Sequence, residues 1–185
     1  LLFLIEYASF DSQTTIGNGI VDLPESLSVS SSVRTGRTTS FIDKTGQDYA
    51  VAYRGIENLW GNTWTMIDGA NLYNDAMTTI YWSNDELDLS ITEGYNMINA
   101  SSPNNKGSIR RFGYDENYSF AFIPSELTEE NYINENYEQK ENSGWRIFLS
   151  GGCWSSGLNA GLFSSKQDYG TSYTNLTISS RLLYY

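Results

Sequence analysis

The residues from Ser150 to Phe163 bring together the side-chain types that proteins use to recognise ligands. Four glycines stand here among a tryptophan, a phenylalanine and short side chains that carry hydroxyl or amide groups. Glycine lets the backbone turn where a Cβ atom would clash, and aromatic rings supply both anchoring and contact area. We therefore expect a rigid surface that presents side chains. A glycine-rich bend between core strands is the alternative that the sequence leaves open.

The composition removes several kinds of catalytic and ligand-binding chemistry. The 185 residues include no histidine and one cysteine, Cys153, and the net charge is −11. Without histidine, neither a Ser-His-Asp triad nor a Cys-His pair can form, and the commonest metal ligand is missing. The acidic charge repels the phosphate backbone of nucleic acids. We expect no metal, no cofactor and no nucleic-acid partner.

One charged pair has a spacing that raises the question of catalysis. Arg54 and Glu57 follow an apolar strand-like segment and precede Trp60 and Trp64. They are either a catalytic pair or side chains that fasten loop backbone around two buried tryptophans. The structural interpretation is favoured because buried charges are usually paired for structure.

Carboxylates also cluster in the run from Asn84 to Asp88. The spacing differs from that of an EF-hand loop, so the run predicts a solvated acidic turn. Two carboxylates at a separation of ~5 to 9 Å can hydrolyse a glycoside, but the sequence does not show such a separation.

The elements that must position these residues are mainly strands. Aromatic residues make up 15% of the chain and charged residues 18%, which favours short strands and long polar loops over helix bundles. Asp68-Gly69 is typical of a turn. Strands are expected at Leu2–Ala8, around Trp64 and Met66, at Thr78–Trp82, at Phe120–Ile123 with Pro124 ending it, at Trp145–Leu149 and at Leu176–Tyr185.

The length predicts a single domain over residues 1–185. The apolar first and last segments predict that the two termini pair or lie close together. The chain does not begin with methionine, so we expect a piece of a longer polypeptide or one trimmed at its start. The apolar run Leu1–Ile5 stops at Glu6, far short of the ~20 residues of a membrane span, so no membrane partner is expected.

Several motifs in their order along the chain resemble the C-type-lectin-like fold of the formylglycine-generating-enzyme type, also called the sulfatase-modifying type. The motifs are the run Tyr53–Trp64, Asp68-Gly69, Gly144-Trp145-Arg146, Gly151-Gly152-x-Trp154 with Asn159-Ala160-Gly161, and Ile178-x-x-Arg181-Leu182. The resemblance spans about Glu6 to Leu182. It is nearest to the version on bacteriophage tail and fibre proteins and on the variable proteins of diversity-generating retroelements. Cys153 and the Ser179-Ser180 pair before Arg181 depart from the family pattern.

The resemblance implies an α+β domain with a twisted, mainly antiparallel sheet, few short helices, long loops and paired terminal strands. It also implies that the Gly-Gly-x-Trp region and the segment after it face the ligand. The ligand-binding residues so implied are Trp154, Ser155, Ser156, Leu158, Asn159 and Phe163, with an extension to Lys166, Asp168, Tyr169, Ser172 and Tyr173. Trp154 is equally well a buried anchor. The implied structural residues are Arg54, Glu57, Trp60, Trp64 and Trp145.

The function that the resemblance implies is recognition without catalysis, because the family's enzymes need reactive cysteines that this chain lacks. We expect a receptor-recognition or adhesion domain of a bacteriophage virion, on a tail, a fibre or a capsid appendage. It would attach to a host-surface glycan or protein. We also expect it to form a homotrimer and to contact other virion subunits. The alternatives are a structural virion module that makes subunit contacts and a carboxylate-dependent glycoside hydrolase.

Overall fold

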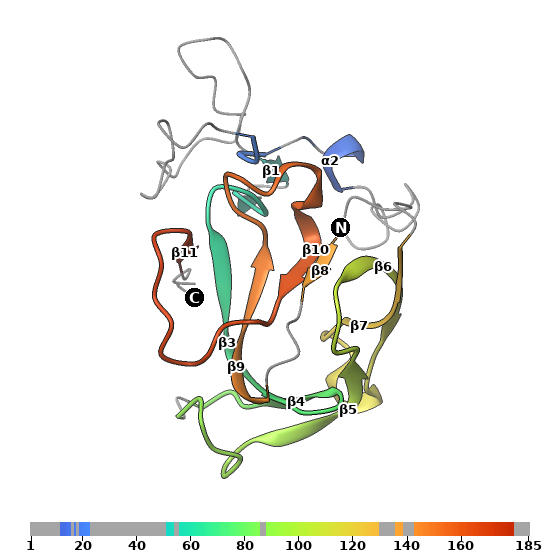
Figure 1. Cartoon of the computed structure of the whole chain (residues 1–185), viewed down its shortest axis with the longest axis vertical. Coiled ribbons are helices and arrows are strands. Elements are labelled where there is room, and N and C mark those ends of the chain that lie inside the picture. Colours follow the sequence, from blue (N-terminus) through green and yellow to red (C-terminus); the bar gives the residue numbers. More distant parts are fainter. Residues whose placement is uncertain are drawn as a thin grey trace.

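In the part of the chain that its computed structural model describes, the regular secondary structure is almost all strand (Figure 1). The structure describes residues 12–15, 17, 19–22, 51–53, 56–85, 88–129, 136–138 and 143–179. Strand accounts for 48% of the structure. Helical structure in the described part is limited to α2 (Ser12–Thr15) and the 3-10 turns η2 (Glu116–Tyr118) and η3 (Gly157–Asn159). The expected α+β class is therefore wrong, and the protein is nearly all β.

The strands form one large sheet and one small one. The small sheet pairs β1 (Ala52–Tyr53) with β2 (Ile56–Glu57). The large sheet has nine strands in the order β5-β4-β3-β9-β10-β8-β6-β7, with β11 beside β3. Its bounds are β3 Trp64–Asn74, β4 Thr78–Trp82, β5 Asn96–Ser102, β6 Gly107–Gly113, β7 Ile123–Thr128, β8 Asn136–Glu138, β9 Gly144–Gly151, β10 Gly161–Lys166 and β11 Ile178–Ser179. The β8–β10 and β3–β11 pairs are parallel, and the other pairs are antiparallel.

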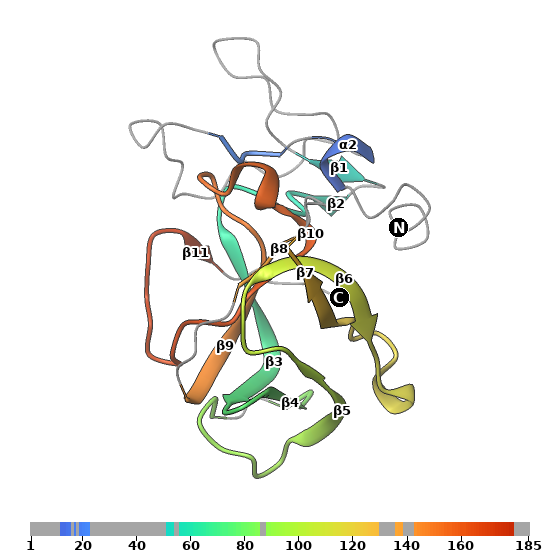
Figure 2. The ribbon, with the colours of Figure 1, turned by 45° about the vertical axis from the view of Figure 1, so that its right-hand side comes forward.

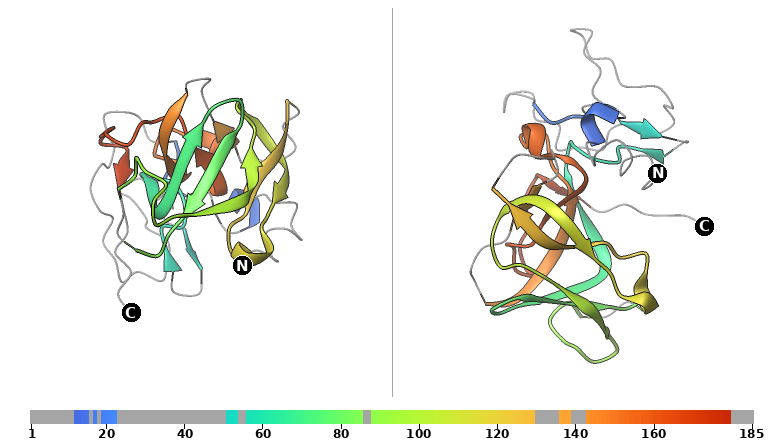
Figure 3. Two further views of the ribbon diagram at one scale, coloured as in Figure 1. Left: turned by 90° about the horizontal axis from the view of Figure 1, so that it is seen from below. Right: turned by 90° about the vertical axis from the view of Figure 1, so that its right-hand side faces the viewer.

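The large sheet curls until its two ends meet. β5 and β7 stand at opposite ends of the strand order, yet they contact each other. Views from the side and from below show the strands curving around a common interior (Figure 2, Figure 3). The result is a nearly closed, barrel-like sheet in place of the twisted sheet of an α+β domain that we expected.

The apolar core has two parts. Inside the curl, Leu72, Ile80 and Ile98 are register partners on β3, β4 and β5, and Ile123 joins them from β7. Their side chains point inward together because partners in adjacent strands share one face of the sheet. The second part lies where β9 runs into β10, and its buried members are Val21, Val51, Trp60 and Ala160.

Two of the expected strands are confirmed closely. β4 spans Thr78–Trp82 as predicted, and β9 contains the whole predicted segment Trp145–Leu149. β3 holds Trp64 and Met66 but also continues through the predicted turn at Asp68-Gly69, so that turn is wrong. The register between β3 and β9 shifts between Met66 and Asn71, which shows that Gly69, at φ +77°, permits an irregularity within a strand.

The prediction that Pro124 ends a strand is also wrong. β7 begins at Ile123 and contains Pro124, and within the sheet it pairs only with β6. A strand at the end of the order tolerates proline because its missing N–H has no ladder partner to lose. The segments Leu2–Ala8 and 180–185 lie outside the described residues. The described part of the last strand, β11, pairs with β3 in parallel.

Among the described residues, no helix is both long enough and apolar enough to cross a membrane.

Candidate binding surface and interior pocket

The glycine-rich loop, residues 152–160, connects β9 to β10, and distant parts of the chain hold its backbone. The N–H of Trp154 donates to the carbonyl of Asn62 at 2.9 Å. The N–H of Gly157 donates to the carbonyl of Val21 at 2.8 Å. These bonds tie the loop to two segments that are remote in sequence, so tertiary contacts fix its conformation.

A buried side-chain amide clamps the same loop from α2. The Nε2 atom of Gln13 donates to the carbonyl oxygens of Gly157, at 2.9 Å, and Ala160, at 2.8 Å. Beside it, the Oγ atom of Ser12 accepts a hydrogen bond from the N–H of Leu162 at 3.1 Å. Figure 1 shows α2 next to the turn between β9 and β10. The short helix α2 thus stabilises the loop through hydrogen bonds from its side chains.

The loop is also braced from within. The N–H of Cys153 donates to Oγ of Ser156, and the N–H of Ser156 donates to the carbonyl of Cys153, both at 2.9 Å. Gly152, at φ +85°, lies so close to Ala160 that a Cβ atom there would stand 2.7 Å from the Ala160 Cβ. Ser156 was expected to bind ligand, but its hydroxyl is engaged in holding the loop.

Three side chains of the loop face solvent. Ser155 and Asn159 are exposed, and Leu158 is 66% exposed, whereas Trp154 is half-buried. The carbonyl of Asn159 accepts a hydrogen bond from Oγ of Ser164 at 2.6 Å, so its backbone is held while its amide stays outside. The loop therefore presents a hydroxyl, an isobutyl group and an amide on a fixed backbone.

Phe163 differs from these exposed side chains because its ring packs against other rings. It is half-buried, and its ring lies 5.0 Å from the ring of Phe112 and 6.4 Å from that of Phe122. The structure places it in an aromatic cluster with β6 and the segment before β7, where it contributes to packing.

Lys166 and Asp168 form part of an ion-pair network. The Nζ atom of Lys166 lies 2.7 Å from a carboxylate oxygen of Glu138 and 3.5 Å from one of Asp168, whose side chain is fully buried. Burial acts to lower the pKa of Lys166, but the hydrogen bond with Glu138 and the charge of Asp168 outweigh it and raise the pKa. The network ties β10 to β8, so these two residues have structural partners.

Tyr169 and Tyr173 stack with ring centroids 3.9 Å apart and planes 3° from parallel. The Lys166 ammonium lies 5.2 Å from the Tyr169 ring centroid. The carbonyl of Tyr169 accepts from the N–H of Ile147, in the middle of β9, whereas the glycine-rich loop follows the end of that strand. With the exposed Ser172, the two tyrosines make a second surface, the tyrosine stack, on the segment after β10. The expected ligand-binding residues are therefore not brought to one surface.

The residues expected to be structural take different positions. Trp60 is 2% exposed in the core cluster beneath the loop. Trp64 is half-buried and opens β3 beside β11. Trp145 packs edge-on against Tyr73, with ring centroids 5.0 Å apart. Arg54 and the side chain of Glu57 lie outside the described residues, so their pairing stays a prediction.

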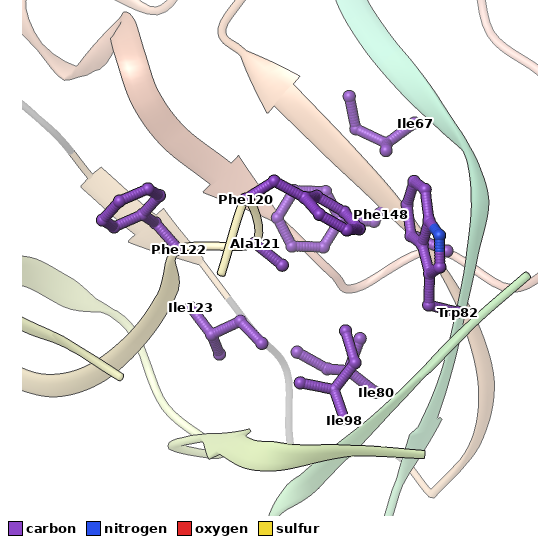
Figure 4. Close-up of a pocket in the computed structure, with 10 residues that line it drawn as sticks. Ile67, Ile80, Trp82, Ile98, Phe120, Ala121, Phe122, Ile123 and Phe148 are labelled. Atoms are coloured by element: carbon purple, nitrogen blue, oxygen red, sulfur yellow. The ribbon is translucent and has the colours of Figure 1, made fainter. Parts of the chain in front are cut away.

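A pocket inside the curled sheet was not predicted from the sequence. This interior pocket has a volume of about 210 Å³ and is partly open to solvent. Figure 4 shows its lining residues, which are Ile67, Ala70, Ile80, Trp82, Ile98, Phe120, Ala121, Phe122, Ile123 and Phe148. These residues come from β3, β4, β5, β7, β9 and the segment before β7. No local pattern in the sequence shows that such distant residues converge.

Comparisons with known proteins do not assign the chain to a family. No protein-family model, no curated protein and no solved structure matches it. Among the described residues, no group of three or more cysteine, aspartate or glutamate side chains could hold a metal ion. The resemblance drawn from the motifs stays a prediction, and functional inference rests on the geometry of the two sites.

Proposed function

We propose that this chain is a non-enzymatic recognition domain that binds a cell-surface partner through the glycine-rich loop. The observation that carries the proposal is the contrast between side chain and backbone within this loop. Ser155, Leu158 and Asn159 are exposed, although the backbone that carries them is held by hydrogen bonds from α2 and two other remote segments.

A fixed backbone favours binding because the loop loses little conformational entropy when a partner binds. Ordering one residue costs about 1–2 kcal/mol of conformational entropy, and here folding has already met that cost. Full burial of a leucine side chain contributes about 1.5–3 kcal/mol, and Leu158 is 66% exposed. The adjacent Asn159 amide and Ser155 hydroxyl supply directional hydrogen bonds that select among partners.

The biological setting of the proposal comes from the motif resemblance alone. Under it, the domain sits on a bacteriophage tail, fibre or capsid appendage and attaches the virion to a host-surface glycan or protein. A homotrimer would raise a weak single-site affinity by avidity. These points stay predictions.

A second candidate function is a structural module that buries the same surface between subunits. Leu158 is 66% exposed, and an exposed leucine is also suited to subunit contacts. The two functions differ in whether the loop is free to meet an external partner.

The test is binding of the labelled domain to intact cells and envelope extracts of candidate bacterial hosts. The Leu158→Ala/Asn159→Ala variant should bind about tenfold more weakly or worse, because it removes both contact types. Met97→Ala/Asn105→Ala is the matched control, since it removes an exposed apolar side chain and an exposed amide elsewhere. Circular dichroism and thermal unfolding verify that each variant folds.

A third variant, Ser172→Ala/Tyr173→Ala, tests the rival surface. Loss of binding in this variant alone would move the site to the tyrosine stack. Equal binding by all variants, or none by the wild type even when trimerised, would reject the loop as a receptor site and favour the structural module. Treating the cells with protease or with periodate distinguishes a protein from a glycan as the partner.

A further inference from the structure

We infer that the interior pocket binds a small, uncharged aromatic molecule, of the size of one ring with a short alkyl substituent. This inference does not rest on the proposed function, because the pocket and the glycine-rich loop share no residue. It follows from the chemistry of the pocket wall, from its size and from the arrangement of its rings.

The wall of the interior pocket is apolar. Its ten residues are isoleucine, alanine, phenylalanine and one tryptophan, so the indole N–H of Trp82 is the one polar side-chain group that they contain. That N–H donates to Oδ1 of Asn84 at 3.3 Å. A charged ligand would lose its hydration here without gaining a partner, which is strongly unfavourable. The wall therefore selects an uncharged ligand.

The size of the pocket limits the ligand. A dry cavity of about 150 Å³ lined by leucine, isoleucine and phenylalanine is large enough for benzene. The interior pocket, at about 210 Å³, has room for one such ring and a short alkyl substituent, but for little more. A steroid or a long acyl chain would not fit within it. Because five strands of a nearly closed sheet and the segment before β7 contribute to the wall, its shape is built into the fold.

The rings around the pocket favour an aromatic ligand over an aliphatic one. The ring of Phe120 lies 5.0 Å from that of Trp82 at 64°, and 6.2 Å from that of Tyr118 at 83°. Figure 4 shows the rings of Phe120, Phe148 and Trp82 grouped on one side, with Ile80 and Ile98 across from them. Rings in edge-to-face arrangements offer both edges and faces, to which a further ring can add.

The opening of the pocket carries unusually exposed rings. Phe120 is 59% exposed and Phe122 is 39% exposed, although both line the pocket. A ligand seated between them and the isoleucines would cover apolar surface that water now contacts. These two phenylalanines therefore define where the ligand enters.

The experiment is a titration of the folded domain, labelled at isoleucine methyl groups, with 4-fluorotoluene, followed by NMR. We expect the methyl signals of Ile67, Ile80, Ile98 and Ile123 to shift, while those of Ile20 and Ile147, which are buried outside the pocket, stay in place. For a ligand of this size, a dissociation constant of roughly 0.1 to 1 mM is expected. Methylcyclohexane should bind at least about threefold more weakly because it lacks a π-system. Phenylacetate should not bind because it is charged.

Two variants test the assignment. Ala121→Leu fills the pocket from its opening and should weaken 4-fluorotoluene binding about tenfold or more, whereas Leu158→Ala/Asn159→Ala should leave it unchanged. Phe120→Ala removes an exposed ring, so it should fold even if Ala121→Leu does not, and should weaken binding about threefold.

Several outcomes would overturn the inference. They are no shift of the four pocket methyls at saturating 4-fluorotoluene, equal shifts with phenylacetate, and unchanged affinity in Ala121→Leu. If Ala121→Leu does not fold, unchanged affinity in Phe120→Ala decides against the inference. Loss of cell binding by the loop variant has no bearing on this result, so the two proposals fail separately.

Discussion

Replacing Gly152 with alanine tests how tightly the glycine-rich loop is built. Gly152 has φ +85°, a conformation that residues with a Cβ atom adopt at a cost. The added Cβ would lie 2.7 Å from the Ala160 Cβ and 2.9 Å from its Cα. The second of these is a main-chain carbon, so no side-chain rotation relieves the contact. The loop must shift, and Ala160 is fully buried in the core cluster beneath it.

The magnitude follows from two contributions. A left-handed conformation costs about 1–2 kcal/mol for a residue with a Cβ atom, and overpacking in a dense region costs about 1–3 kcal/mol. Gly152→Ala should therefore lower the free energy of unfolding by about 2–5 kcal/mol. For a chain of this length, each kcal/mol lowers Tm by about 2–4 °C, so a fall of roughly 4–20 °C is expected.

The assay is denaturant unfolding followed by circular dichroism, with thermal unfolding as a second measure. Gly170→Ala is the matched control, because no atom lies within 4 Å of the Cβ position at Gly170 and its φ is not positive. Its effect should stay within about 0.5 kcal/mol. If Gly152→Ala proves as stable as this control, the close approach to Ala160 is not part of the native fold and the loop is not fixed as described.

Two further predictions concern buried polar groups. Gln13→Ala removes both hydrogen bonds from the Gln13 side chain to the loop and leaves two carbonyl groups without that donor. It should lower the free energy of unfolding by about 2–4 kcal/mol, as measured by denaturant unfolding. A variant as stable as the wild type would contradict the proposed role of Gln13. Burial raises the pKa of Tyr137 to about 12, and its hydroxyl donates toward the Pro103 carbonyl at 2.8 Å. Because the unfolded pKa is about 10, this contribution to stability is present below pH 10 and is lost as pH rises through 12. Tyr137→Phe should flatten that alkaline loss of stability, and an unchanged pH profile would refute the assignment.

The sequence predicted individual strands well where local pattern decides them. Thr78–Trp82 and Trp145–Leu149 are rich in β-branched and aromatic residues, and both lie in central strands of the large sheet. The turn predicted at Asp68-Gly69 is wrong because turns and β-bulges both use the ability of glycine to adopt a positive φ. The α+β class entered through the resemblance, and the curl that brings β5 against β7 has no local signal.

The candidate site was predicted in part. The glycine-rich loop does present exposed side chains, because its glycines and short polar residues allow tight turns and internal bonds. No local pattern indicates that Gln13, more than 140 residues away, clamps the loop, since one glutamine in a polar segment is not distinctive. Nor could it separate Tyr169 from the loop, because that separation depends on the length and direction of β10.

The most direct test of the central claim is site-specific photo-crosslinking on intact cells. A photoreactive amino acid is placed at the exposed position Ser155, with Asn105 as the control position and Ser172 as the position that reports on the tyrosine stack. We expect a cell-surface component to be crosslinked from position 155 and not from positions 105 or 172. Crosslinking from position 172 alone, or equal crosslinking from all three positions, would contradict recognition through the glycine-rich loop.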